Sequence, residues 1–425
     1  MIASGSHRVS NRLPMAADYS NRRANGKPAE SRHGGARDRV PADPTQKRGR
    51  VSKETRMLQR TRKRRERSRI QPGGEQEVAG EAEIEAAARQ RGERFTTNSG
   101  GLSCGVTIGA FIDLPAALRR LVPEVEDGGW REEGRADCAN CPMVPARSGA
   151  DPDAAWAFDE RFRCCTYHPA MASFLVGRAL ARGGDGAAQL HARMADPDGV
   201  SAWGIYPRAG ARARYLAVRD HAFGRDPALR CPYIGEGGCS VWPDRPGVCR
   251  TWYCKHDAGG RGAHTWSRLE AALWQAENRL AFRLIELGDA PAENAGAEVF
   301  ADWYRWCAER IDTLTDDELA PVHVPALAEA RAELVQIRRR PPAAMPDLLV
   351  PAVSDATPQG DRVRVCGYSL FDEVLAPRAV FSLLARLDGA TPWPDALAAC
   401  RADGHELDEA LIAELYRNGA LAPAT

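Results

Sequence analysis

The chain of 425 residues has no long apolar stretch. No segment reaches the ~18 apolar residues that a membrane-spanning helix needs, and residues 1–30 contain no apolar stretch of the length found in a secretory signal. The sequence therefore predicts neither a membrane protein nor a secreted one, and we expect it in the cytoplasm. In that reducing compartment, clustered cysteines are expected to bind metal rather than to form disulfides.

Residues 1–95 contain almost no aromatic side chains, with no Trp, one Tyr and one Phe. They carry 23 Lys and Arg against 12 Asp and Glu, a net charge of +11, whereas residues 96–425 carry 35 against 45, a net charge of −10. A segment this poor in apolar groups cannot offset its ordering entropy, so we expect a disordered basic tail. Its densest basic run, Arg60–Arg67, is compatible with contact to nucleic acid or an anionic surface. The absence of interleaved aromatic residues favours a solvated tail, or a reading frame that begins further on.

Residues 96–340 show mainly helical periodicity. Apolar residues recur at three- and four-residue steps in the ranges where we expect helices, which are 170–182, 187–194, 265–287, 297–314 and 324–339. Residues 200–206 and 214–218 are typical of short strands or irregular connections. Cys104 and Cys307 lie in this region; we expect Cys104 to be a free core or surface thiol and Cys307 to pack in the core.

A Pro- and Ala-rich linker is predicted at 341–358, followed by a small module at 359–425. The alternation at 362–368 predicts a strand, and three helices are expected at 379–387, 393–402 and 408–418. This order resembles a winged-helix module. Its last helix is acidic and would be repelled by a phosphate backbone, so we expect a protein or peptide partner rather than nucleic acid. Cys366 and Cys400 are expected to be structural.

Eight of the twelve cysteines fall between residues 138 and 254. Thiolates are preferred ligands for zinc and for iron–sulfur clusters. The predicted metal ligands are Cys138, Cys141, Cys164, Cys165, Cys231, Cys239, Cys249 and Cys254. Eight thiolates suffice for two four-coordinate zinc ions, or for one four-iron cluster with thiols to spare, so spacing alone leaves both cofactors open.

Two of the predicted ligands, Cys164 and Cys165, are adjacent in the chain. In an extended backbone the two side chains diverge, so one can bind a metal while the other serves a second ion or packs. A vicinal disulfide would be strained. His168 follows closely and is either a nitrogen ligand or a hydrogen-bonded residue that shapes the turn.

The segment from Cys231 to Arg250 is the most specific part of the sequence. It reads Cys-Pro-Tyr at 231–233 and Arg-Pro-Gly-Val-Cys-Arg at 245–250. These residues resemble the bacterial cysteine-cluster family of zinc- or iron-chelating domain proteins (the YkgJ type). Trp242 stands where that family usually has Tyr. The family's first group is packed as CxxCxxCC, whereas 22 residues separate Cys141 from Cys164 here. The resemblance covers about residues 138–256.

Positive side chains flank the cysteines, with Arg245 and Arg250 beside Cys249 and Lys255 after Cys254. Clustered thiolates repel one another, so we expect these cations to lower the thiol pKa values. Prolines at 232, 243 and 246 are expected to stiffen the loops that carry the ligands.

Three functions remain open. The first is a metal-binding protein with a structural or redox role. The second is an iron–sulfur-dependent enzyme, which the resemblance makes conceivable through a distant relative, the flagellin lysine methylase. The third is a zinc-stabilised interaction scaffold. No glycine-rich cofactor fingerprint is present, since Gly235–Gly238 lies between two cysteines. Any catalytic residue beside the metal is expected among His168, His256 and Asp257.

These observations predict a mainly α-helical protein. A loop-rich, cysteine-bearing metal core is expected to be wrapped by helices, with the winged-helix-like module at its C-terminal end. The metal would fix a core that is otherwise too rich in loops to bury itself.

Overall fold

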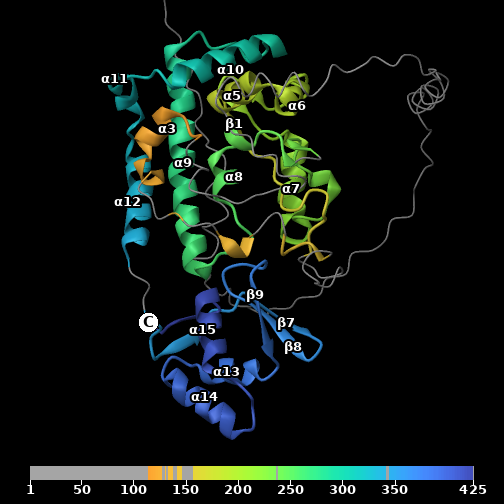
Figure 1. Cartoon of the computed structure of the whole chain (residues 1–425), viewed down its shortest axis with the longest axis vertical. Coiled ribbons are helices and arrows are strands. Elements are labelled where there is room, and N and C mark those ends of the chain that lie inside the picture. The colour runs from red at the N-terminus through yellow and green to blue at the C-terminus, as the bar shows by residue number, and fades with distance from the viewer. Residues whose placement is uncertain are drawn as a thin grey trace, which may run out of the picture. The chain divides into compact units, whose positions relative to one another are not determined.

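The computed structural model describes most of the chain beyond residue 112, and Figure 1 labels its elements. The described residues are 113–126, 130, 133–136, 141–145, 157–235, 238–340 and 344–424. They belong to one compact unit. The expected basic tail at 1–95, Cys104 and Cys138 lie outside these ranges.

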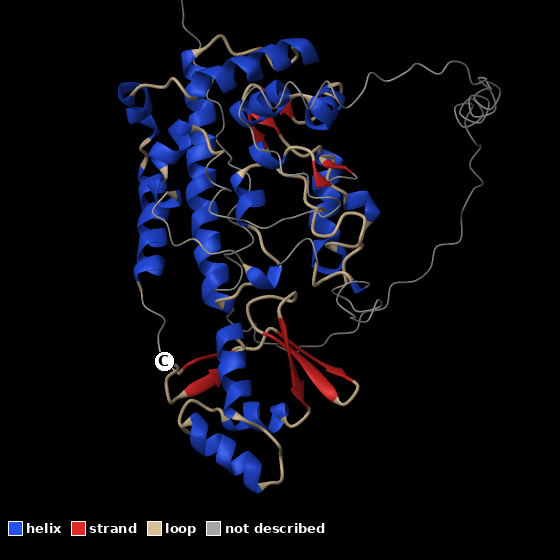
Figure 2. Cartoon of the chain, viewed as in Figure 1, coloured by secondary structure: helices blue, strands red, loops and turns tan. Residues whose placement is uncertain are grey.

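The described chain is mainly helical, and its strands are short (Figure 2). The part from 113 to 340, called the helical body below, contains α3 (Ala116–Leu121), α5 (Ser173–Arg182), α6 (Gly184–Met194), α7 (Ala209–Ala222), α8 (Gly247–Thr251), α9 (Gly259–Leu287), α10 (Ala297–Ile311), α11 (Asp316–Leu319) and α12 (Pro325–Arg339). All five predicted helices of this region are present, with their ends displaced. None of the described helices has the length and apolar character to cross a membrane.

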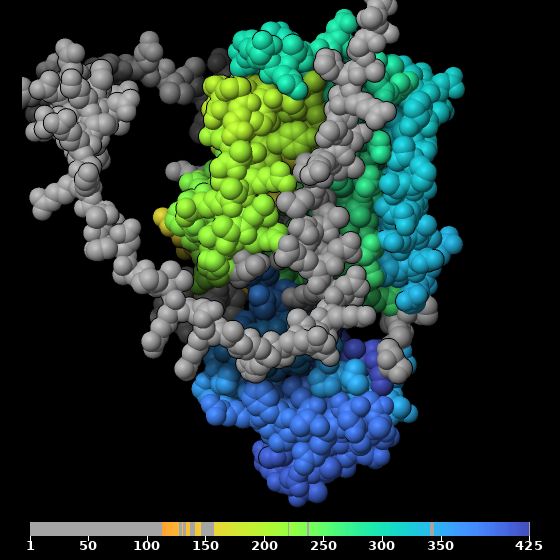
Figure 3. Space-filling model, turned by 180° about the vertical axis from the view of Figure 1, so that it is seen from behind, coloured from red at the N-terminus to blue at the C-terminus, as the bar shows by residue number. Residues whose placement is uncertain are grey.

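Helix α9 is the central element of the helical body, because α3, α8, α10 and α12 all pack against it (Figure 1). Its buried face repeats at helical spacing and includes Trp266, Leu269, Leu273, Leu280 and Leu284. Each buried leucine stabilises the fold by roughly 1.5–3 kcal/mol. Helix α12 runs beside α9, and the two are also seen side by side from behind (Figure 3).

Helices α5 and α10 form the closest helix pair. Gly177 of α5 lies so near α10 that a Cβ built on it would be 1.7 Å from the carbonyl oxygen of Tyr304. The Tyr304 hydroxyl donates hydrogen bonds to the carbonyl oxygens of Ser201 (2.8 Å) and Gly204 (3.1 Å). Through these hydrogen bonds the helix pair also holds the strands that contain Ser201 and Gly204.

Two small antiparallel sheets complete the body. In the first, β3 (Gly204–Ile205) pairs with both β1 (Met171–Ala172) and β2 (Val200–Ser201). The second is the hairpin of β4 (Ile234–Gly235) and β5 (Gly238–Cys239). The segment 200–206, where we expected a short strand or an irregular connection, is thus a tight hairpin.

Residues 214–218 are helical, which corrects the expectation of a strand or irregular connection. They lie inside α7, Ala209–Ala222. This segment contains arginine, leucine and alanine, which are among the best helix formers, so local propensity favours the helix. Most of the helix is exposed, so no buried face imposes the strand period.

The C-terminal module, residues 348–424, contains five strands and three helices. Its elements are β6 (Leu349–Pro351), β7 (Asp355–Gln359), β8 (Arg362–Cys366), β9 (Glu373–Pro377), α13 (Val380–Arg386), α14 (Trp393–Ala402), α15 (Glu409–Asn418) and β10 (Leu421–Pro423). Strands β7, β8 and β9 form an antiparallel sheet, and β6 pairs with β10. The strand and the three helices predicted here are all present.

The predicted linker at 341–358 is shorter in the structure. Strands β6 and β7 fall inside that range and pair within the module, and Leu349 is fully buried. Proline at 351 and 358 suggested a linker, but both positions lie on edge strands, where proline is tolerated. The module has its own hydrophobic core, separate from the core around α9.

Candidate metal centre

Four of the predicted ligands come together beside α8 and the β4–β5 hairpin. Their thiols lie close enough for their charges to interact. This first thiol group consists of Cys165, Cys231, Cys239 and Cys249. The Cys231 amide donates to the carbonyl oxygen of Cys165 (2.8 Å), and β5 places Cys239 opposite Ile234. Segments that are distant in sequence therefore meet here.

Helix α8 holds Cys249 through a contact that the sequence did not reveal. The amide of Gly247 donates to the Oε1 of Glu277 on α9 (2.8 Å), and the Thr251 hydroxyl donates to the carbonyl oxygen of Gly247 (2.9 Å). Glu277 is only 2% exposed, and burial raises its pKa to about 7. A carboxylate at the start of a helix is a favourable partner for its amides.

The loop between Cys239 and Cys249 is fixed by arginines. Arg250 is buried and donates to the carbonyl oxygens of Arg245 (2.8 Å) and Pro243. The guanidinium of Arg245 lies 3.4 Å from the centroid of the Trp242 ring, a cation–π contact. Arg250, expected to lower thiol pKa values, therefore serves mainly to shape this loop.

Asp244 anchors the same loop to α5. Its buried carboxylate accepts from the Nε atoms of Arg178 (3.2 Å) and Arg182 (2.7 Å). The two arginines remain partly exposed, so solvent screens these ion pairs, but together they tie the loop to α5.

The second thiol group consists of Cys141, Cys164 and Cys254. Cys254 interacts electrostatically with Cys141, and all three belong to one apolar cluster with Met143 and Phe158. Cys138, three residues before Cys141, lies outside the described residues. The predicted set of eight is thus divided between two places.

Burial governs the protonation of both groups. Burial raises the pKa of Cys249 well above its ordinary value, and the neighbouring thiols raise it further. Burial raises the pKa of Cys254 to about 12, and the thiol of Cys141 adds to this. Arg245 and Lys255 act in the expected direction, lowering the pKa values of Cys249 and Cys254 respectively, but burial outweighs both.

Within the described ranges, no three Cys, His, Asp or Glu side chains converge closely enough to hold a metal ion. Zinc needs four ligands with Zn–S distances of about 2.3 Å. The thiols of either group therefore have to move inward, and lose their protons, before they can act as ligands.

His168 acts as a hydrogen-bonded residue of the loop. Its Nε2 lies 2.8 Å from the carbonyl oxygen of Arg230, the residue before Cys231. Burial lowers the pKa of His168, so the ring is neutral at pH 7. When Nε2 donates to this carbonyl oxygen, Nδ1 of the neutral ring keeps its lone pair, so the ligand role of His168 stays a prediction.

His256 and Asp257 also make structural contacts. The Asp257 carboxylate accepts from the amides of Gly134 and Arg135 (3.0 Å each). Burial lowers the pKa of His256 to about 4. Its Nδ1 lies 3.2 Å from the hydroxyl of Tyr368, which comes from the C-terminal module.

Two shallow hollows on the described part of the surface are bordered by other residues. One of about 360 Å³ lies between α5 and α10 and is bordered by Arg178, Arg182 and Arg305, among others. Another of about 260 Å³ lies at the start of α12. Neither is bordered by cysteine.

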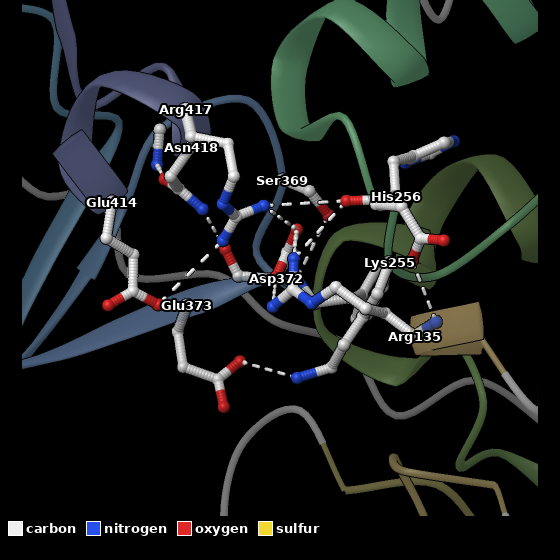
Figure 4. Close-up of polar contacts among 12 residues, drawn as sticks. Arg135, Lys255, His256, Ser369, Asp372, Glu373, Glu414, Arg417 and Asn418 are labelled. Atoms are coloured by element: carbon white, nitrogen blue, oxygen red, sulfur yellow. Dashed lines mark hydrogen bonds and ion pairs between the residues drawn. The ribbon is translucent and has the colours of Figure 1, made fainter. Parts of the chain in front are cut away.

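The C-terminal module places two residues beside the second thiol group, and we did not predict either of them from the sequence. Phe371 packs against the cluster containing Cys141 and Cys254. The neighbouring Asp372 is completely buried and forms an ion pair with Arg135 of the body (Figure 4). No local pattern marks either residue, because both act through contacts with distant segments.

Comparison with known proteins gives no relative for this chain: no family model, curated protein or solved structure matches it.

Proposed function

We propose that this protein binds metal through two cysteine sites, one formed by the first thiol group and one by the second thiol group together with Cys138. The observation that supports this most directly is the gathering of cysteines that are far apart in sequence. Cys165 and Cys249 are 84 positions apart, yet their thiols interact, as do those of Cys141 and Cys254.

The surroundings of the thiols also favour metal. Clusters of protonated thiols that are buried or partly buried gain little from one another, since sulfur is a weak hydrogen-bond donor and acceptor. A divalent metal replaces the protons and compensates two of the four thiolate charges, and nearby cations such as Arg245 and Lys255 oppose the rest. The fixed loop around Arg250 and the helix held by Glu277 would limit how far the first group has to move.

The metal would have a structural or redox role, and either zinc or iron–sulfur suits four thiolates. The Cys-Pro steps at 141–142 and 231–232 favour iron–sulfur. The resemblance to the YkgJ-type family agrees with either. An iron–sulfur-dependent enzyme remains the alternative if a cluster is found.

The deciding experiment is purification without oxygen, followed by an ultraviolet–visible spectrum and analysis of iron, zinc and acid-labile sulfide. Broad visible absorption with iron and sulfide would establish a cluster. Colourless protein with stoichiometric zinc and no sulfide would establish a structural site, and would favour the scaffold in which the C-terminal module binds a protein or peptide. Protein that is folded but lacks metal would overturn the proposal.

A further inference from the structure

We propose that the C-terminal module is a gate for the second thiol group. The loop between β8 and β9, residues 367–372, covers Cys141, Cys164 and Cys254, and an ion-pair cluster around Asp372 acts as the latch. The part of this inference that concerns access of a metal rests on the proposed function. The part that concerns covering of the thiols is independent of it.

The cover is formed by one aromatic side chain. Phe371 reaches from the module into the body, where its ring lies 5.3 Å from that of Phe158, 5.5 Å from that of Phe223 and 6.3 Å from that of Trp252. These rings border the apolar cluster that contains the second thiol group. Among the described residues, Phe371 is therefore the module's aromatic contact with this cluster.

The latch is centred on the next residue. Asp372 accepts a hydrogen bond from Arg135 of the body (2.8 Å), and its other oxygen lies 2.6 Å from the same guanidinium. Arg417 of α15 adds a second positive charge at 3.9 Å. Both arginines also donate to the carbonyl oxygen of His256, at 3.3 and 3.5 Å (Figure 4).

Tyr368 connects the latch to the segment that follows Cys254. Its hydroxyl donates to Asp372 (2.5 Å) and accepts from the backbone amide of His256 (3.1 Å). Lys255 pairs with Glu373 at 3.6 Å. Cys254, a proposed ligand of the second group, is thus followed directly by Lys255 and His256, which both contact the module.

The interface is suited to opening. Its polar contacts are mostly charged, and the module keeps a hydrophobic core of its own, so separation leaves these two cores intact and breaks only the apolar cluster around Phe371. Polar interfaces between self-contained units generally permit relative motion. The first thiol group is instead held through α8, whose Gly247 amide donates to Glu277 of α9.

Thiol labelling tests the gate in the full chain as purified under reducing, oxygen-free conditions. Iodoacetamide is added briefly, and mass spectrometry of the peptides gives a labelling rate for each cysteine. The variants are Phe371→Ala, which removes the cover, and Asp372→Asn, which weakens the latch. Phe381→Ala is the matched control, because Phe381 is on the same module and 45% exposed.

We expect Cys164 and Cys254 to be labelled at least about tenfold faster in both variants, because modification follows the population of the open state. Cys231 and Cys249 should keep their wild-type rates, as should every cysteine in the control. Unchanged rates in a folded Phe371→Ala protein would overturn the inference, and so would equal acceleration of both thiol groups. If Asp372→Asn fails to fold, Phe371→Ala decides. Metal analysis of the same samples tests the proposed function separately.

Discussion

Cys164 and Cys165 are adjacent in the chain but belong to different thiol groups. The Cys165 carbonyl accepts from the amide of Cys231, and its thiol interacts with those of Cys231 and Cys249. Cys164 instead packs with the cluster of Cys141 and Cys254. Arg163, just before the pair, has a φ of 50°, a conformation uncommon outside glycine. The pair is therefore the point where the two proposed metal sites meet.

Because the two cysteines belong to different groups, we predict that substituting each one has a separate effect on metal content. Cys164→Ala should remove the metal of the second group alone, and Cys165→Ala that of the first group alone. Each variant is expected to retain about half of the wild-type metal, because a four-ligand site rarely survives the loss of one ligand. Metal analysis of the purified variants measures this. Complete loss of metal from either variant would indicate a single shared site.

Cysteines outside the two groups should be dispensable for metal. Cys249→Ala is expected to lower the metal content, whereas Cys400→Ala should leave it unchanged. Cys400 is fully buried in the core of the C-terminal module, so its replacement costs stability alone, about 1 kcal/mol. Equal loss of metal from both variants would contradict the assignment of the ligands.

Glu277 predicts a pH-dependent stability. Its pKa of about 7 in the folded chain exceeds the ordinary value of 4.5. Between these values the folded chain holds a proton that the unfolded chain has released, so the free energy of unfolding falls as pH rises from 4.5 to 7. Below that range the carboxyl is protonated in both states, and above it the carboxyl is ionised in both.

Glu277→Gln should remove this part of the pH dependence. The amide oxygen of Gln can still accept the hydrogen bond from Gly247, but the side chain does not ionise. Urea unfolding of wild type and variant at pH 5 and pH 8 gives the difference. We expect the wild type to lose up to about 3 kcal/mol more than the variant over that interval. The same loss in both proteins would show that Glu277 is ionised throughout.

The contact between α5 and α10 predicts an unusual cost for a glycine-to-alanine change. Alanine normally favours a helix by about 1 kcal/mol over glycine. At Gly177 the added methyl would lie 1.7 Å from the Tyr304 carbonyl oxygen, so α10 must move. We expect Gly177→Ala to destabilise the protein by about 1–3 kcal/mol in urea unfolding.

Gly210 provides the matched control for that change. It lies in α7, and nothing is within 4 Å of a Cβ built there. Gly210→Ala should leave stability unchanged or raise it by up to about 1 kcal/mol. If both variants unfold at the wild-type urea concentration, the helices are not packed as closely as described.

The sequence was most informative where local periodicity coincides with burial. The long apolar stripe of α9 and the three helices of the module were predictable, because each buries one face against a single core. The exposed α7 was misjudged for the opposite reason: it buries no apolar face, so its sequence shows no apolar stripe at helical spacing.

The site was predictable only in part. Cysteine spacing identified the candidate ligands but not which of them belong to which thiol group. That assignment depends on the path of the 65 residues between Cys165 and Cys231. Glu277 and Asp372 were missed, since a buried carboxylate is recognised by its partners, here Gly247 and Arg135. Those partners are distant in the chain and no local motif connects them.

The pairing of β6 with β10 brings the beginning and the end of the C-terminal module to the same edge, with Leu349 opposite Pro423. A unit that enters and leaves at one place can be exchanged between proteins without rerouting the rest of the chain. It is also vulnerable at its last residues, because a premature stop that removes Leu421–Pro423 takes away the partner of the strand that begins the module.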